Sequence, residues 1–193
     1  MARTETLTAL LPFVHRLPTL YGRPVRAWSL YVATGGTTYV GHDGYEDVVA
    51  THYAYDSSVP NHTQVNEGDL LILRDGHGSL GVARAETLKS RAGTKRRRRC
   101  PTCGTSQVEL RKSLAPQYRC TNGHTFENPV AANEPTTLYR LEYGRSFRPF
   151  DRLTATQMER LCVAAAKQNA IRELNVDRTL ASLRAHGMEA VPE

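Results

Sequence analysis

The 193-residue sequence has no long apolar run, and this absence excludes a membrane-spanning helix, which needs roughly 18 or more consecutive apolar residues. The N-terminal residues also lack the apolar core of a secretory signal peptide. We therefore expect a cytoplasmic protein with no membrane partner. Thiols stay reduced in that compartment, so the four cysteines are expected to bind metal rather than to form disulfides.

Sequence signatures of common enzymes are missing as well. The chain contains no Gly-x-Ser-x-Gly nucleophile elbow, no phosphate loop ending in Gly-Lys-Ser/Thr and no His-Glu-x-x-His metal motif. The zinc deaminase signature is also absent, since no His-x-Glu precedes the first cysteine pair. The sequence thus predicts a non-catalytic binding protein.

Acidic residues are nearly absent from one segment, and this gives the chain its net charge of +6. Residues 91–119 contain nine Lys or Arg and one Glu, whereas the rest of the chain has slightly more acidic than basic residues. Clustered cations can bind a nucleic acid backbone by releasing its counterions, and a solvated basic linker is the alternative. The predicted phosphate contacts are Lys95, Arg96, Arg97, Arg98, Arg99, Arg111, Lys112 and Arg119.

Three of the cysteines belong to a pattern typical of zinc ribbons. Cys100 and Cys103 are separated by two residues, and Cys120 and His124 follow as a second pair. Such a set, with no acidic ligand, predicts one closed, tetrahedral, structural zinc site that contributes folding energy to a short segment. The alternative is three reduced cysteines near a surface histidine. Cys162 is expected on the apolar face of a C-terminal helix, as a core residue rather than a metal ligand.

Short apolar segments separated by Gly-rich turns favour an α+β fold that contains a small β-barrel or curled sheet. Strands are predicted at residues 26–33, 48–55, 70–74 and 80–85, and a returning strand at 138–143 would make the ribbon an insertion. Residues 90–94 are expected as a linker. The predicted regions are a β-barrel-like region at 1–92, a basic zinc ribbon at 93–132, and a returning strand with helices packing on the barrel at 133–193.

The C-terminal region carries helix signals. Thr154 and Gln157 have the spacing of a capping box, and the apolar face that follows includes Met158 and Leu161, with Ile171 at its far end. A shorter helix is predicted over residues 177–185, ending near Gly187.

A group of aromatic and polar residues in the β-region is a candidate pocket for a nucleobase. Tyr53 and Tyr55 share one face of a predicted strand and run into a polar loop. Stacking rings beside hydrogen-bonding groups suit an unstacked base, and a carboxylate can accept from the exocyclic amine of cytosine. The alternative is that the tyrosines fill the core while the polar residues cap a turn. The predicted pocket residues are Trp28, Tyr53, Tyr55, Asp56, Ser57 and Asn61.

Several of these motifs, taken in order, resemble a known family. The run YAYDSSVPN at 53–61, VNEGDLLILRD at 65–75, GVAR at 81–84, the two metal-binding pairs and QNAIREL at 168–174 resemble the N-terminal module of bacterial HNH restriction endonucleases that act on modified DNA. The Gly-Asp strand with its Gly-Val return also resembles the PUA superfamily of β-barrels, which includes SRA, EVE and YTH readers. The resemblance implies a PUA-like barrel that binds modified DNA through an extruded base.

The resemblance does not extend to the nuclease part, because no candidate for a His-Asn-His metal site is present. The resemblance, without its nuclease part, therefore implies a nucleoid-associated protein that binds double-stranded DNA, with 5-methylcytosine as the expected modification, and does not cleave it. The alternatives are an RNA-binding PUA-like protein, a non-catalytic interaction protein of a restriction or regulatory system, and a nuclease with an unrecognised site.

Overall fold

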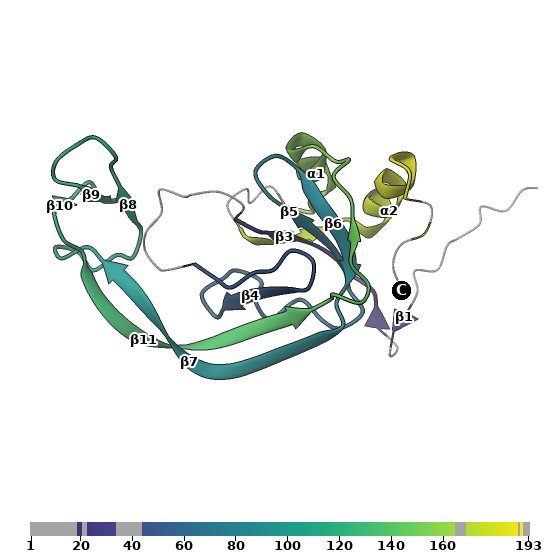
Figure 1. The fold of residues 1–193 in the computed structure, drawn as a ribbon, viewed down its shortest axis with the longest axis horizontal. Helices are drawn as coiled ribbons and strands as arrows, with labels where there is room; N and C mark the ends of the chain where they lie inside the picture. The colour runs from purple at the N-terminus through teal and green to yellow at the C-terminus, as the bar shows by residue number, and fades with distance from the viewer. Residues whose placement is uncertain (1–18, 21–22, 34–43, 165–168, 189, 191–193) are drawn as a thin grey trace, which may run out of the picture.

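The computed structural model describes residues 19–20, 23–33, 44–164, 169–188 and 190, and it confirms the α+β class (Figure 1). Its central sheet has five strands in the order β12-β6-β5-β3-β13. β3 and β5 run parallel, and the other neighbours are antiparallel. The strands are β3 (Ala27–Tyr31), β5 (Leu70–Arg74), β6 (Ser79–Arg84), β12 (Arg148–Pro149) and β13 (Ile171–Leu174).

A long two-stranded arm extends from this region. It is formed by β7 (Thr87–Arg99) and β11 (Val130–Glu142), which pair antiparallel along all thirteen residues of each strand. β4 (His52–Asp56) pairs with the base of β11, so the return of the chain predicted at 138–143 is confirmed. The arm curves away from the central sheet (Figure 1).

The ribbon is carried at the tip of the arm. It is a three-stranded sheet made of β8 (Val108–Leu110), β9 (Tyr118–Cys120) and β10 (Thr125–Phe126). Both of its ends continue into arm strands, and the ribbon is therefore an insertion between β7 and β11 (Figure 1). The expected region boundaries at residues 92 and 132 fall within these two strands. A further short pair, β1 (Thr19–Leu20) and β2 (Arg23–Pro24), lies near the start of the chain.

The prediction of a linker at residues 90–94 is wrong, because all five residues lie in β7. Gly and, to a lesser degree, Ala have low strand propensity, but each residue of β7 has a partner on β11 that supplies the pairing. Gly93 is placed tightly against Leu138, so that a Cβ atom added there would lie 2.6 Å from Leu138 Cδ1. The cross-strand pairing thus overrides local composition.

No closed barrel forms among the residues that the structure describes, which corrects the barrel expectation. The strands fall into separate sheets, and the first core lies between two of them. Trp28, Leu71 and Leu73 of the central sheet pack in this core with Tyr53 and Tyr55 of β4. The second core lies on the other side of the strand residues Leu70, Ile72 and Val82 and is covered by both helices.

The two helices are α1 (Ala155–Leu161) and α2 (Val176–Ala185), and the capping box of Thr154 with Gln157 is confirmed. The extension of the first helical pattern to Ile171 is wrong, since Ile171 lies in β13 and pairs with Leu30. Tertiary pairing with the central sheet overrides the helical spacing. Within the described ranges, no helix is long and apolar enough to cross a membrane.

Candidate metal centre and basic arm

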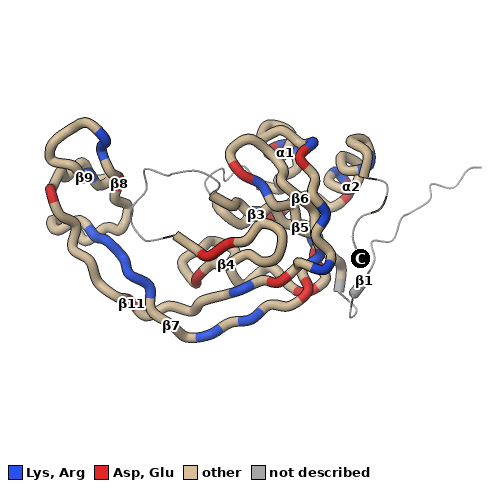
Figure 2. The backbone as a smooth tube through the Cα atoms, viewed as in Figure 1, with Lys and Arg blue, Asp and Glu red and all other residues tan. Residues whose placement is uncertain are grey.

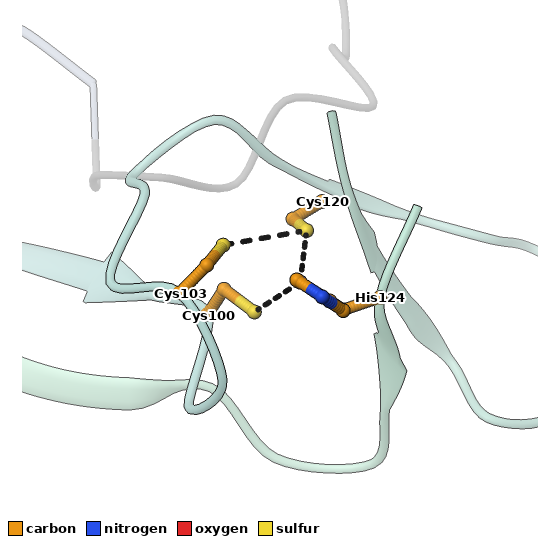
Figure 3. A group of neighbouring side chains, drawn as sticks. All are labelled: Cys100, Cys103, Cys120 and His124. Atoms are coloured by element: carbon orange, nitrogen blue, oxygen red, sulfur yellow. Dashed lines mark hydrogen bonds between the residues drawn. The ribbon is translucent and has the colours of Figure 1, made fainter. Parts of the chain in front are cut away.

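Four predicted ligands converge in the ribbon, and this group could hold a metal ion (Figure 3). The ligand atoms of Cys100, Cys103, Cys120 and His124 all lie within 4.8 Å of one another. His124 Nδ1 is 3.7 Å from Cys100 Sγ and 3.5 Å from Cys120 Sγ, and the sulfurs of Cys103 and Cys120 are 3.9 Å apart. With metal–sulfur bonds of about 2.3 Å and metal–nitrogen bonds of about 2.0–2.1 Å, a tetrahedral site has edges of about 3.8 Å and 3.6 Å. The spacing therefore fits a tetrahedral ion such as zinc.

Two similar turns bring these ligands together. The N–H of Gly104 donates to the carbonyl of Cys100, and the N–H of Gly123 donates to that of Cys120, each at 2.9 Å. Gly104 and Gly123 have φ values of 72° and 84°, a region in which residues with a side chain are strained. Glycine at these two positions thus allows the chain to fold back on each cysteine.

Backbone N–H groups of the first turn lower the pKa of two of the thiols. The backbone N–H of Thr105 lowers the pKa of Cys103 to about 6. Burial raises the pKa of Cys100, but the backbone N–H groups of Cys103 and Thr102 outweigh it and the net shift is downward. Since the thiolate is the form that binds metal, the fold favours the ligating state of these two cysteines. Burial raises the pKa of Cys120, and the hydrogen bonds with Cys103 and Cys100 raise the pKa of His124, so these two ligands gain no such advantage.

The ribbon has a very small core of its own. The buried residues are the two ligands Cys100 and Cys120 together with Val108 and Phe126, and the ring of Tyr118 is stacked against Phe126. So few apolar contacts cannot offset the entropy of ordering the segment. The ligand cluster is therefore the main element that can hold the ribbon together.

The structure places the predicted base-pocket tyrosines in the core. Trp28, Tyr53 and Tyr55 are 1%, 2% and 1% exposed. The indole Nε1 of Trp28 donates to Asp69 Oδ2 at 2.9 Å, and the hydroxyl of Tyr55 donates to the carbonyl of His62 at 3.2 Å. These rings fill the space between the two sheets, in agreement with the core alternative.

Asp56 of the predicted pocket is the centre of a buried ion cluster. Its Oδ2 lies 3.0 Å from Lys95 Nζ and 3.3 Å from Arg97 Nη2, and its Oδ1 accepts from both the N–H and the hydroxyl of Ser58. The ammonium of Lys95 also lies 3.3 Å from the ring centroid of Tyr45. Asp56 is fully buried and its oxygens are engaged, so they are not directed toward a ligand.

The other two residues of that set serve local structure. The exposed Ser57 hydroxyl lies 3.0 Å from the hydroxyl of Thr136 on the arm. Asn61 has a φ of 66°, and its Nδ2 donates to the carbonyl of Ile171 at 2.9 Å. Both residues tie the loop after β4 to its neighbours, and the structure does not bring the six predicted residues together around one cavity.

The basic residues of the arm divide into two groups. Lys95, Arg97 and Arg99 alternate along β7 and form ion pairs with Asp56 or Glu134. Arg96 lies between them, is exposed, and makes no ion pair within the described residues. Strand alternation therefore assigns part of the basic run to structure and leaves the side chain of Arg96 exposed.

The ribbon cations show the same division. Arg111 donates through Nε and Nη2 to the carbonyl of Pro116, at 3.1 and 2.7 Å, and so braces the loop between β8 and β9. Lys112 and Arg119 are exposed and have no ion-pair partner in the described part of the chain. Arg98, the remaining predicted contact, is half-buried.

A cavity that the sequence interpretation missed lies beside the arm. It has a volume of about 490 Å³ and is formed by the segment before β4, by β4 itself and by both arm strands. The sequence predicts a linker at 90–94 and therefore gives no sign that β7 pairs with β11. This pairing is what places Lys89 and Arg91 in the same cavity lining as Tyr45. The lining residues are Gly44, Tyr45, Glu46, Ala54, Tyr55, Lys89, Ser90, Arg91, Thr94, Lys95, Arg96, Leu138, Tyr139 and Arg140.

The cluster at Asp56 is expected to make stability depend on acid pH. Burial raises the pKa of Asp56, but hydrogen bonds from Ser58 and the charge of Lys95 bring it down to about 2. A carboxylate whose pKa falls on folding stabilises the native state above its unfolded pKa, so this contribution, roughly 2–3 kcal/mol, is lost as the pH falls from about 4 to about 2. In urea unfolding, the advantage of the wild type over Asp56→Asn should shrink across that range. An advantage that stays constant would contradict this assignment.

Comparison with known protein families, curated proteins and solved structures gives no match for this chain. The resemblance to PUA-superfamily readers and HNH endonuclease modules therefore stays a prediction. The function has to be inferred from the chemistry of the metal centre, the arm and the cavity themselves.

Proposed function

We propose that the protein binds nucleic acid, with duplex DNA as the first candidate, through phosphate contacts of the arm and the ribbon. The observation that carries this proposal is the set of exposed cations without ion pairs along the described arm and ribbon: Lys89, Arg91, Arg96, Lys112 and Arg119. Figure 2 shows basic residues along the length of β7 and on the ribbon. Such a row suits a polyanion better than a compact ligand.

In this proposal the ribbon binds one zinc ion with a structural role. Three thiolates and an imidazole are soft or borderline donors that match zinc, and a full set of four leaves no open position for a reacting water. The ion would fix the β8–β9 loop, which carries Lys112, and the strand β9, which carries Arg119, at the tip of the arm. The role of zinc in this proposal is to keep the cation-bearing surface of the ribbon folded.

Preference for a modified cytosine is a further part of the proposal. Since the predicted tyrosines lie in the core, the cavity beside the arm is where an unstacked nucleotide would be held. A single methyl group buried against an apolar wall such as Leu138 contributes about 0.8–1 kcal/mol, which is a preference of less than about tenfold. Unmodified duplex should therefore still bind.

We expect the double variant Lys112→Gln, Arg119→Gln to bind duplex DNA on the order of tenfold more weakly at physiological salt. Each lost phosphate contact should also reduce the slope of log affinity against log salt by about 0.9. Fluorescence anisotropy over a salt series measures both effects. The matched control is Arg160→Gln, Arg184→Gln on α1 and α2, which removes the same charge far from the ribbon (Figure 1).

The outcome that would refute this proposal is equal weakening by both double variants, because a general charge effect would then explain the binding. Metal content should be measured for each variant, since the ribbon variant must keep its ion for the comparison to hold. Duplexes with and without 5-methylcytosine test the modification. Matched RNA tests the alternative that the ligand is RNA rather than DNA.

A further inference from the structure

We propose that the cavity beside the arm is a binding site for a nucleotide that carries a phosphomonoester, either as a free nucleoside monophosphate or as the phosphorylated end of a strand. This inference deepens the proposed function and rests on it for the strand end. The free nucleotide can be tested without any nucleic acid.

The size and shape of the cavity suit a ligand of this class. Its volume of about 490 Å³ lies within the usual range for small-molecule sites, about 300–1,000 Å³. The ring of Tyr45 and the side chain of Leu138 provide apolar surface in the lining, against which a base can pack. The stacked rings of Tyr55 and Tyr139 have their centroids 5.0 Å apart, and they pack into the core beneath the cavity.

The charge of the lining points to an anion. Lys89 and Arg91 share the face of β7 that carries Lys95, and they make no ion pair within the described residues. Lys95 and Arg140, which also line the cavity, are paired with Asp56 and Glu142. Glu46 is the one acidic residue of the lining. A phosphomonoester carries a charge of about −1.5 to −2 at pH 7, more than the single charge of a backbone phosphate, and guanidinium groups bind it with paired hydrogen bonds.

The aromatic wall is fixed and uncharged. Tyr45 is held by the ammonium of Lys95, which lies 3.3 Å from its ring centroid and is itself anchored by Asp56. Burial, followed by the charge of Asp56, holds the pKa of Tyr45 far above its ordinary value. The phenol thus stays neutral at physiological pH and does not repel a phosphate.

Isothermal titration of the full chain with deoxycytidine 5′-monophosphate, deoxycytidine and inorganic phosphate tests this inference. We expect the monophosphate to bind at least about tenfold more tightly than either of its parts, because only it reaches both the cations and the apolar wall. The cavity variant Lys89→Gln, Arg91→Gln should lose this binding. The ribbon variant Lys112→Gln, Arg119→Gln should retain it, and circular dichroism confirms that both variants fold.

Equal binding of the monophosphate and deoxycytidine, or unchanged binding in the cavity variant, would overturn the inference. A wild-type chain that binds duplex but not the monophosphate would also overturn it while leaving the proposed function intact. Conversely, monophosphate binding with no duplex affinity would support the cavity and refute the function. Oligonucleotides with a 5′-phosphate or a 5′-hydroxyl then distinguish the sources: a preference for the phosphate identifies the strand end, and equal binding identifies the free nucleotide.

Discussion

Serine in place of Cys120 is expected to abolish metal binding and to unfold the ribbon while the central sheet stays folded. The physical reason is the small size of the ribbon core, which contains only Val108 and Phe126 besides the buried ligands. Structural zinc in comparable peptides contributes an apparent 10–16 kcal/mol or so, far more than these few contacts can supply. The central sheet has two separate apolar clusters and does not depend on the ion.

Native mass spectrometry measures the loss of the ion, and limited proteolysis measures the exposure of residues 100–126. Trp28 is the single tryptophan and is buried in β3, so its fluorescence reports on the central sheet alone. The matched control is Cys162→Ser, because Cys162 lies outside the cluster and its thiol donates to the carbonyl of Met158. If Cys120→Ser kept one ion per chain, or if its Trp28 emission matched that of unfolded protein, the assignment would be wrong.

The ligand cluster could be predicted from the sequence because its geometry is local. A two-residue gap between Cys100 and Cys103 and a three-residue gap between Cys120 and His124 each fit within one turn, and only one strand pairing is needed to bring the pairs together. The capping box at Thr154 was predictable for the same reason. Both motifs depend on contacts over a few residues.

The surroundings of the predicted base pocket and the strand at residues 90–94 could not be predicted from local sequence, because both depend on long-range strand pairing. The ionic role of Asp56 is set by Lys95 and Arg97, about forty residues away on a strand that composition alone would not assign. Likewise, the cavity exists only because the segment at Tyr45 lies against the arm. The register of strand pairing decides which of the two faces a side chain occupies, and that register depends on the partner strand as well as on the local sequence.

Asparagine in place of Asp56 is expected to lower the free energy of unfolding by about 3–5 kcal/mol at pH 7. The replacement keeps the shape of the side chain but removes its charge. Lys95 and Arg97, whose side chains are only 8% and 12% exposed, then lose their shared counter-ion. Urea unfolding followed by Trp28 fluorescence measures the loss. The control is Glu86→Gln, whose partner Arg145 is 86% exposed and for which the loss should stay below about 1 kcal/mol.

The same variant links stability to the cavity. Because Lys95 holds the ring of Tyr45 and is anchored by Asp56, the loss of that carboxylate frees both side chains at the cavity wall. Asp56→Asn should therefore reduce the preference for the monophosphate over inorganic phosphate even under conditions in which the variant is fully folded, whereas Glu86→Gln should not. Similar small losses of stability in the two variants would show that the buried cluster contributes no more than an exposed ion pair, and the arm would then owe its position to apolar packing and to the pairing of β11 with β4.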